Sequence, residues 1–189
     1  MRKNFGSGKG GPLMFPMPVL MIATYDENGM PNVMNAAWGG ISGVKEISIC
    51  VDLGHKTTAN VKARRAFTVS MAVADQVAAC DYVGIVSGND APDKFARAGF
   101  HAVKSEFVDA PVIRELPMTL ECRLVSYDDT TERLVGEIVN ISAEEGVLGE
   151  DGKIDVQKLR PITFDPVHNT YLTLGEIVGN AFRDGLKLK

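Results

Sequence analysis

Short apolar runs separated by turn-forming residues dominate the hydrophobic pattern of this chain. The first run, residues 19–25, is followed by Asp26-Glu27-Asn28-Gly29, in which Asn-Gly is a strong hairpin signal. Later runs of similar character cover residues 31–38, 46–51, 66–73, 118–128 and 133–144. Each of these runs predicts a β-strand.

Helical signals are fewer and shorter. Residues 59–66, 76–86 and 93–98 each predict a short helix, and Gly99 is placed to end the last of them. Gly39-Gly40 is expected to bend the chain. Because strands predominate and do not alternate with helices, the pattern predicts a mainly β fold, a closed antiparallel barrel of Greek-key type.

The composition is typical of one globular domain. The chain has 189 residues, of which 45% are apolar and 23% are charged, and this is enough for a substantial core. We expect a flexible, Gly-rich lead over residues 1–15 and a single domain over residues 16–189. A net charge of −4, without a cluster of basic and aromatic residues, argues against a nucleic-acid partner.

Cysteine usage indicates a reducing compartment. The three cysteines, Cys50, Cys80 and Cys122, lie far apart, and two of them fall in predicted strands, so we expect buried thiols. No Cys/His spacing suggests zinc. Prolines break the apolar stretch after the lead, which argues against a signal peptide or a membrane span. We therefore expect a cytoplasmic protein with no membrane partner.

The segment His55-Lys56-Thr57-Thr58-Ala59-Asn60 lies between a predicted strand and a predicted helix. A helix N-terminus has unsatisfied N–H donors and the positive end of the helix dipole. Thr57 or Thr58 can serve as the N-cap, and Lys56 adds a positive charge. This combination favours a phosphate site. The competing interpretation is an ordinary threonine cap beside a solvated lysine.

The order of several motifs resembles the flavin reductase-like, FMN-binding split-barrel family, and within it the flavoredoxin-like branch. The resemblance covers residues 16–179. The motifs that carry it are Pro-Met-Pro-Val at 16–19, Asn-Ala-Ala-Trp at 35–38, His-Lys-Thr-x-x-Asn at 55–60, the segment 81–88, Asp-Lys-Phe at 93–95 and Gly136-Glu137. It implies a split barrel that binds FMN non-covalently and forms a two-fold homodimer, with FMN near the subunit interface.

The resemblance also assigns residues to the flavin ring. Asn35, Ala36, Ala37 and Trp38 would border the isoalloxazine, since small side chains let the backbone approach and a tryptophan can stack. Trp38 could instead be a core aromatic. Tyr171 would cover the ring from the C-terminal segment of the same chain or of the partner subunit.

Other residues are assigned to the ribityl chain. Asp52 and Leu53 would pass near it, although Asp52 could equally be a turn residue. Ser87 and Gly88 would form a polar turn toward the cofactor, or a plain loop.

The resemblance assigns a further set of residues to the phosphate. Lys56, Thr57 and Asn60 would bind it and His55 would assist, although Asn60 could be an ordinary helix residue and His55 merely exposed. Lys94 would reach the flavin or its phosphate, or be a solvated helix charge.

One position departs from the family pattern. Flavoredoxin-like sequences often carry a histidine about five residues before the late Gly-Glu, where this chain has Thr131. A threonine hydroxyl can replace only the hydrogen bond of an imidazole.

The resulting hypothesis is an FMN-containing oxidoreductase that accepts hydride from NAD(P)H, with the cofactor carrying the chemistry. The closest alternative is a flavoredoxin-type electron carrier to a protein partner. A further alternative is a non-enzymatic module that binds another phosphorylated ligand or haem. A hydrolase using Ser87 or Cys80 has no supporting GxSxG or Cys/His pairing.

Overall fold

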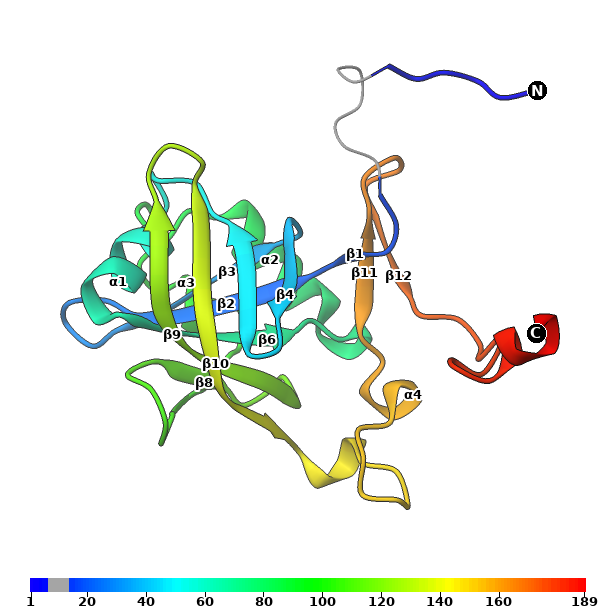
Figure 1. Ribbon diagram of the computed structural model, residues 1–189. Coiled ribbons are helices and arrows are strands. Elements are labelled where there is room, and N and C mark those ends of the chain that lie inside the picture. The colour runs from blue at the N-terminus through cyan, green and yellow to red at the C-terminus, as the bar shows by residue number, and fades with distance from the viewer. Residues whose placement is uncertain (7–13) are drawn as a thin grey trace.

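The computed structural model describes residues 1–6 and 14–189, so residues 7–13 of the expected lead lie outside the described part. A seven-stranded antiparallel sheet curls into a split barrel (Figure 1). Its strands, in spatial order, are β3 (Pro31–Ala36), β2 (Leu20–Tyr25), β6 (Ala66–Met71), β9 (Met118–Asp128), β10 (Arg133–Ala143), β5 (Glu46–Cys50) and β4 (Gly39–Gly43). The mainly β, split-barrel fold expected from the sequence is confirmed.

The barrel is split between β3 and β4, the two edge strands of this sheet. Only Ala37 and Trp38 separate them in the chain, and the Cys50 N–H donates to the Trp38 carbonyl at 2.8 Å. The expected bend at Gly39-Gly40 was wrong, because these residues begin β4. A Cβ on Gly39 would lie 2.9 Å from the Ser48 carbonyl oxygen, so glycine permits the close approach of β4 to β5.

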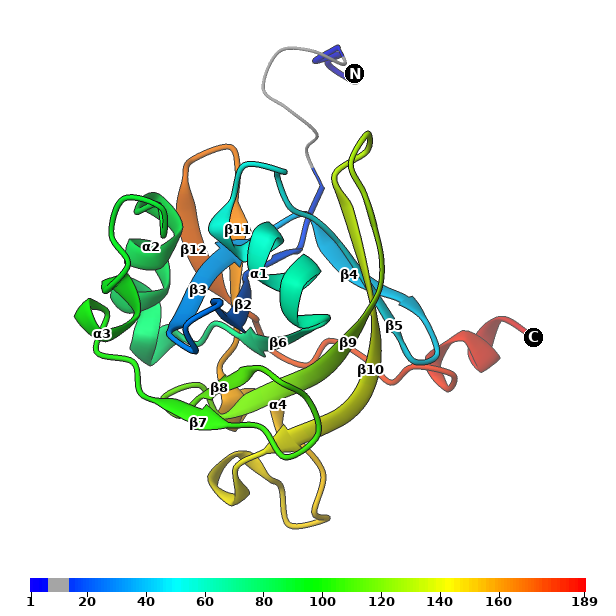
Figure 2. The ribbon, with the colours of Figure 1, turned by 90° about the vertical axis from the view of Figure 1, so that its left-hand side faces the viewer.

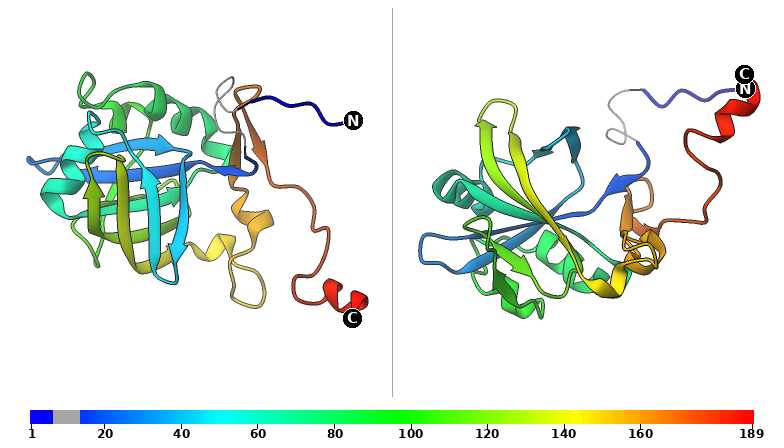
Figure 3. Two further views of the ribbon diagram at one scale, coloured as in Figure 1. Left: turned by 45° about the horizontal axis from the view of Figure 1, so that its top comes forward. Right: turned by 60° about the horizontal axis from the view of Figure 1, so that its bottom comes forward.

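Two smaller sheets accompany the barrel. β1 (Met17–Pro18), β11 (Ile162–Asp165) and β12 (Thr170–Thr173) form one, and β7 (Ala102–Lys104) pairs with β8 (Pro111–Ile113) in the other. The three-stranded sheet stands beside the barrel, and the C-terminal segment extends away from it (Figure 3). β11 lies in a segment for which the hydrophobic pattern predicts no strand.

The helices are short, as expected. They are α1 (Lys56–Arg64), α2 (Val77–Ile85), α3 (Lys94–Arg97) and α4 (Val156–Leu159), with 3₁₀ turns η1 (Ala74–Gln76), η2 (Glu145–Val147) and η3 (Asp184–Leu188). α2 and α3 lie on one side of β3 (Figure 2). α1 begins three residues earlier than the sequence predicts, and Gly99 follows α3 with a φ of 78°, as expected. Within the described residues, no helix is both long and apolar enough to cross a membrane.

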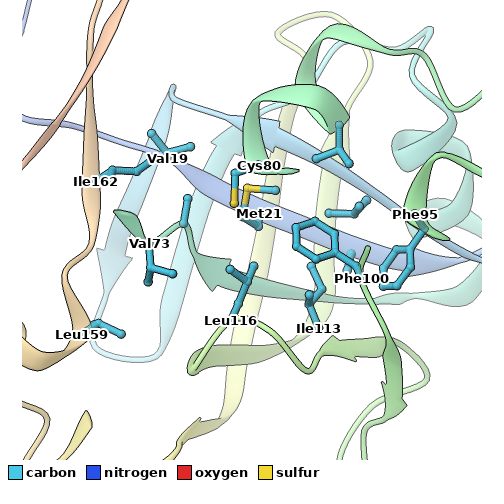
Figure 4. Packing of buried hydrophobic residues seen from close by; sticks show 14 of the residues in the cluster. Val19, Met21, Val73, Cys80, Phe95, Phe100, Ile113, Leu116, Leu159 and Ile162 are labelled. Atoms are coloured by element: carbon cyan, nitrogen blue, oxygen red, sulfur yellow. The ribbon is translucent and has the colours of Figure 1, made fainter. Parts of the chain in front are cut away.

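Strand β2 is buried on both faces and joins two cores. Leu20 and Ile22 point into the barrel, whereas Met21 and Ala23 point to the opposite face and pack in the cluster that contains Cys80 of α2 (Figure 4). This explains why β2 is continuously apolar rather than alternating. The layer of helices therefore packs on the barrel through β2 together with the neighbouring edge strand β3, whose Val33 lies in the same cluster.

The cysteines only partly match the expectation of buried thiols. Cys80 and Cys122 are buried, and burial raises the pKa of each thiol to about 12. Cys50 is exposed, so its expected burial was wrong. In β5 the inward positions are Ile47 and Ile49, and the alternation of the strand turns Cys50 outward.

Lys94 joins α2 to α3. Its side chain is almost fully buried, with the residue 3% exposed, and Nζ donates to the carbonyl oxygens of Val83 at 2.9 Å and Val86 at 2.8 Å. These carbonyls lie at the C-terminal end of α2, where the helix dipole favours a cation. Lys94 is therefore not the solvated helix charge that the sequence allowed. Burial lowers the pKa of its ammonium to about 8.

We expect the stability contributed by Lys94 to increase with pH. Its folded pKa of about 8 lies below the ordinary lysine value, so above pH 8 the unfolded chain binds more protons and the free energy of unfolding rises. From pH 7 to pH 10, wild type should gain on the order of 2 kcal/mol relative to Lys94→Met. Urea unfolding measures both, with the exposed Lys104→Met as control. A wild-type-minus-variant difference that is independent of pH would contradict this assignment.

Candidate functional site

Two adjoining cavities lie where α1 begins. The larger is about 450 Å³ and the smaller about 270 Å³, and His55, Lys56 and Gly88 line both. The remaining residues of the larger cavity are Asp26, Glu27, Leu53, Gly54, Ala59, Asn60, Ala63, Asn89 and Pro92. The remaining residues of the smaller are Asn32, Met34, Asn35, Thr57, Val83, Gly84, Ile85, Val86, Ser87 and Lys94.

The residues His55, Lys56 and Gly88, which line both cavities, form the boundary between them. The start of α1 leaves backbone N–H donors available at this boundary. His55, not Thr57 or Thr58, is the N-cap residue, because its backbone is extended and its carbonyl accepts the N–H groups of Thr58 at 3.0 Å and Ala59 at 3.3 Å. The expected threonine cap was therefore wrong. Among the described residues, no acceptor is bonded to the N–H groups of Lys56 and Thr57. Two free donors at a helix N-terminus suit an anion.

Asp52 fixes the turn that leads into α1. Its carboxylate accepts the Gly54 N–H at 2.7 Å, and its carbonyl accepts the Thr58 hydroxyl at 2.7 Å. Asp52 lines neither cavity, so in this structure it acts as the turn residue that the sequence allowed, whereas Leu53 lines the larger cavity.

Thr57 and Gly88 are brought together by Asn32 of β3. The Asn32 amide donates to Thr57 Oγ1 at 2.8 Å, and both residues are buried. A Cβ on Gly88 would lie 2.3 Å from Asn32 Oδ1, so only glycine lets the 87–88 turn approach this closely. Asn32 is a site residue that the sequence analysis missed, since nothing local marks its partner 25 positions away.

Lys56 is held by Asp26. Its Nζ lies 3.1 Å from Asp26 Oδ2. Burial raises the pKa of Asp26, but hydrogen bonds from the Met30 N–H, the Lys56 ammonium and the Asn28 N–H outweigh it and lower that pKa below its usual value. An ammonium has three N–H donors, so pairing with Asp26 leaves capacity for a second anion.

Most of the Asn35–Trp38 segment lies at a third cavity, and Asn35 also lines the smaller of the two cavities at α1. Asn35 Nδ2 donates to the Cys80 carbonyl at 2.9 Å, and a Cβ on Gly84 would lie within 2.3 Å of that amide, so Asn35 packs tightly on α2. Ala36 and Ala37 are half-buried and, with Asn35, border a third cavity of about 110 Å³. Trp38 is 57% exposed and is therefore not a core aromatic.

Tyr171 reaches the same wall from β12 of the same chain, lining the third cavity with Asn35, Ala36 and Ala37. Its hydroxyl donates to Asp81 Oδ1 at 2.7 Å, and burial together with Asp81 raises the pKa of this phenol to about 12. The Phe164 ring lies 5.9 Å from that of Tyr171, centroid to centroid. Tyr171 is therefore an aromatic wall that remains protonated at neutral pH.

The remaining expected residues divide between the two larger cavities. Ser87 and Lys94 line the smaller cavity. Asn60 lines the larger, and its amide donates to Thr24 Oγ1 at 3.0 Å, as a structural contact. Thr131 lies in the turn between β9 and β10, and the neighbouring Glu132 carboxylate accepts the Leu53 N–H at 3.1 Å. This contact places the β9–β10 turn beside the segment that leads into α1.

Comparison with known proteins extends this description. A family model described as "Flavin reductase like domain" matches residues 13–164. Flavoredoxin of Desulfovibrio vulgaris (Miyazaki F) is 36% identical, with coverage of 98% of this chain and 100% of that chain and a TM-score of 0.91. Flavoredoxin from Methanosarcina acetivorans is 26% identical, with both chains fully covered and a TM-score of 0.88.

A more distant structure shares the fold alone. It is the FMN-binding domain of a flavin reductase-like enzyme from Shewanella baltica OS155, 18% identical, covering 86% of this chain and 88% of that chain with a TM-score of 0.77. Since the family model spans most of the chain and ends within β11, it covers every strand of the barrel and the boundary between the two cavities. The chain belongs to the flavin reductase-like domain family.

Proposed function

We propose that this chain is an FMN-binding electron-transfer flavoprotein of the flavoredoxin type. The observation that carries the proposal is the boundary at Lys56, where a cation and two free N–H groups adjoin the buried Thr57. These are the donors that a flavin phosphate requires. The 36% identity to a flavoredoxin over nearly the whole chain supports the electron-carrier assignment.

The residues present fit FMN. Lys56 and the N–H groups of Lys56 and Thr57 would hold the phosphate, with His55 and Gly88 beside them in the lining of the same cavity. Ser87 and Lys94 line the same cavity, although the Lys94 ammonium is hydrogen-bonded to carbonyl groups of α2.

The ring would lie against the Asn35–Trp38 segment. Ala36 and Ala37 permit close backbone approach, Tyr171 closes one side, and exposed Trp38 would shield the ring from water. Bound FMN supplies the redox chemistry, and the protein contributes position and electrostatics. The Tyr171 hydroxyl donates its proton to Asp81 Oδ1, so this proton is not available to the ring.

Lys56→Gln tests the phosphate assignment while keeping most of the side-chain stem. Loss of a charge-assisted hydrogen bond should raise the FMN dissociation constant about tenfold or more. Equilibrium titration followed by flavin absorbance measures it. Lys62→Gln is the matched control, because Lys62 is on the same helix but pairs with exposed Asp129, and it should leave the constant nearly unchanged. Equal effects of the two substitutions would remove Lys56 from the phosphate site.

The second candidate function is an NAD(P)H-linked flavin reductase, which the family match favours. The visible spectrum of the flavin-loaded protein separates the two candidates. For a carrier we expect slow bleaching by NADH or NADPH without oxygen, and rapid bleaching by a chemical reductant such as dithionite. Rapid bleaching by either nicotinamide would instead establish the reductase. No flavin bands after reconstitution with FMN would reject both functions.

We also propose that two copies associate through the β4 edge, with FMN near their boundary. Ile41 of β4 is 67% exposed, Val44 in the turn after β4 is 103% exposed, and Trp38, which lies between β3 and β4 in the chain, adds a third exposed apolar side chain. An edge strand with apolar side chains is suited to an isologous contact. A protein partner that accepts the electrons remains part of this proposal.

The oligomeric state tests the association. Light scattering should give twice the chain mass of 20.4 kDa, and the double variant Ile41→Glu, Val44→Asp should shift the protein toward one chain mass, because it places charges in an apolar contact. The exposed double variant Val125→Glu, Ile141→Asp on β9 and β10 is the control for surface charge. A wild-type protein of single-chain mass at micromolar concentration would reject the association.

A further inference from the structure

The residues after β12 form an arm that the rest of the domain does not cover. This arm, residues 175–189, is exposed throughout and extends away from the barrel (Figures 1 and 3). Val178 is 101% exposed and Phe182 99%, and Ile177, Leu186 and Leu188 are exposed as well. Among the described residues, no hydrophobic core cluster includes any residue of the arm. Single exposed apolar residues are ordinary, but five within this short segment indicate a contact surface.

An apolar groove lies at the base of the arm. Its volume is about 230 Å³, and Met71, Ile162 and Leu174 contribute to its lining. Of the described residues that line it, only Thr163 is polar, and its hydroxyl already donates to the Met17 carbonyl at 2.7 Å. An apolar cavity of roughly 150 Å³ accommodates a benzene molecule. The groove therefore has space for a large aliphatic side chain, and its described lining presents no free polar side chain to an occupant.

The arm does not enter the groove of its own chain. Leu174 lines the groove, but the lining includes none of residues 175–189. The Gln157 amide of α4 donates to the Gly175 carbonyl at 3.3 Å, where the arm begins. Beyond this point the hydrogen bonds found among the described residues stay within the arm, including two that the Asp184 carboxylate accepts. The arm therefore has a local shape of its own, while its apolar side chains stay available to another molecule.

We propose that the arm packs on a second copy of this chain, with Ile177 and Val178 in the apolar groove of that copy, and that the exchange is reciprocal. The arm leaves the domain on the side of the barrel that carries β4 and β5 (Figures 1 and 2). In an isologous pair each copy offers the same arm and the same groove, so one geometry serves both. This inference deepens the association proposed at the β4 edge and rests on it, but it does not depend on FMN.

The β4 edge alone offers few contacts for a stable pair. Its exposed apolar side chains are Trp38, Ile41 and Val44, whereas stable protein interfaces bury about 1,200–2,000 Å². Reciprocal arms add five large apolar side chains from each copy. Because apolar burial is the main favourable term in most protein association, the arms supply contact area that the edge lacks.

Disulfide cross-linking tests the exchange directly. The variant Cys50→Ser, Met71→Cys, Val178→Cys removes the exposed native thiol and places one thiol in the groove and one on the arm, and its remaining native thiols are buried. A disulfide forms only where the two backbones come close. After oxidation with glutathione disulfide, we expect most chains to run at twice the chain mass of 20.4 kDa on a non-reducing gel. The control carries Val125→Cys, an exposed position on β9, in place of Val178→Cys, and should stay at single-chain mass.

Each other result overturns a defined part of the proposal. A disulfide within one chain places the arm in its own groove, and cross-linking of the variant Cys50→Ser, Val178→Cys places the two arms against each other, so either result rejects the exchange. A wild-type protein of single-chain mass in light scattering rejects the association itself. A pair that forms without this cross-link rejects only the exchange of arms.

A charge on the arm gives a second test that needs no cross-link. Val178→Glu should raise the dissociation constant of the pair about tenfold or more, because the groove has no partner for a buried carboxylate. Val167→Glu is the matched control, since Val167 is an exposed valine in the turn between β11 and β12. Sedimentation of both variants over a range of concentrations measures the constants, and thermal melting establishes that each variant folds. Equal constants for the two variants would reject the exchange.

Discussion

The candidate site depends on a single buried amide. Asn32 joins β3 to the start of α1 through Thr57, and its oxygen packs against the turn at Gly88. A buried polar group of this kind is costly unless it is fully bonded, so the three segments are held in one relative position. The free N–H groups of α1 therefore face a cavity whose opposite wall is already fixed, which is the pre-organisation that anion binding requires.

Several strands of the barrel could be predicted from sequence because each is an alternating or a continuously apolar run bounded by turn residues. β9 begins and ends at the predicted residues, and β2 differs by one residue. β4 was missed because a Gly-Gly pair has no alternation to detect, and its place in the sheet follows from the close contact of Gly39 with Ser48. Likewise, the start of α1 is decided by the backbone of His55 rather than by the threonines that propensity favours.

Within the site, groups of neighbouring residues were predictable and long-range partners were not. Residues 55–57, 59–60 and 35–37 line the three cavities, whereas Thr58 and Trp38 line none of them. The roles of Asn32 and Gly84 depend on partners far away in the chain, which one sequence does not reveal. Burial also excluded two alternatives that residue type had left open, because Trp38 is exposed rather than a core aromatic and Lys94 is buried on the carbonyls of α2 rather than solvated.

The pairing of the two ends of the domain affects the order in which the site is assembled. Met17 of β1 pairs with Phe164 of β11, and the Thr163 hydroxyl donates to the Met17 carbonyl across 146 positions. Contacts of such sequence separation form slowly because a long loop must close first. During synthesis, all the residues of the barrel strands and of α1 are made before those of β12. The Tyr171 wall is therefore the last part of the site to be made, and a nascent chain can enclose a cofactor on that side only after β12 has been synthesised.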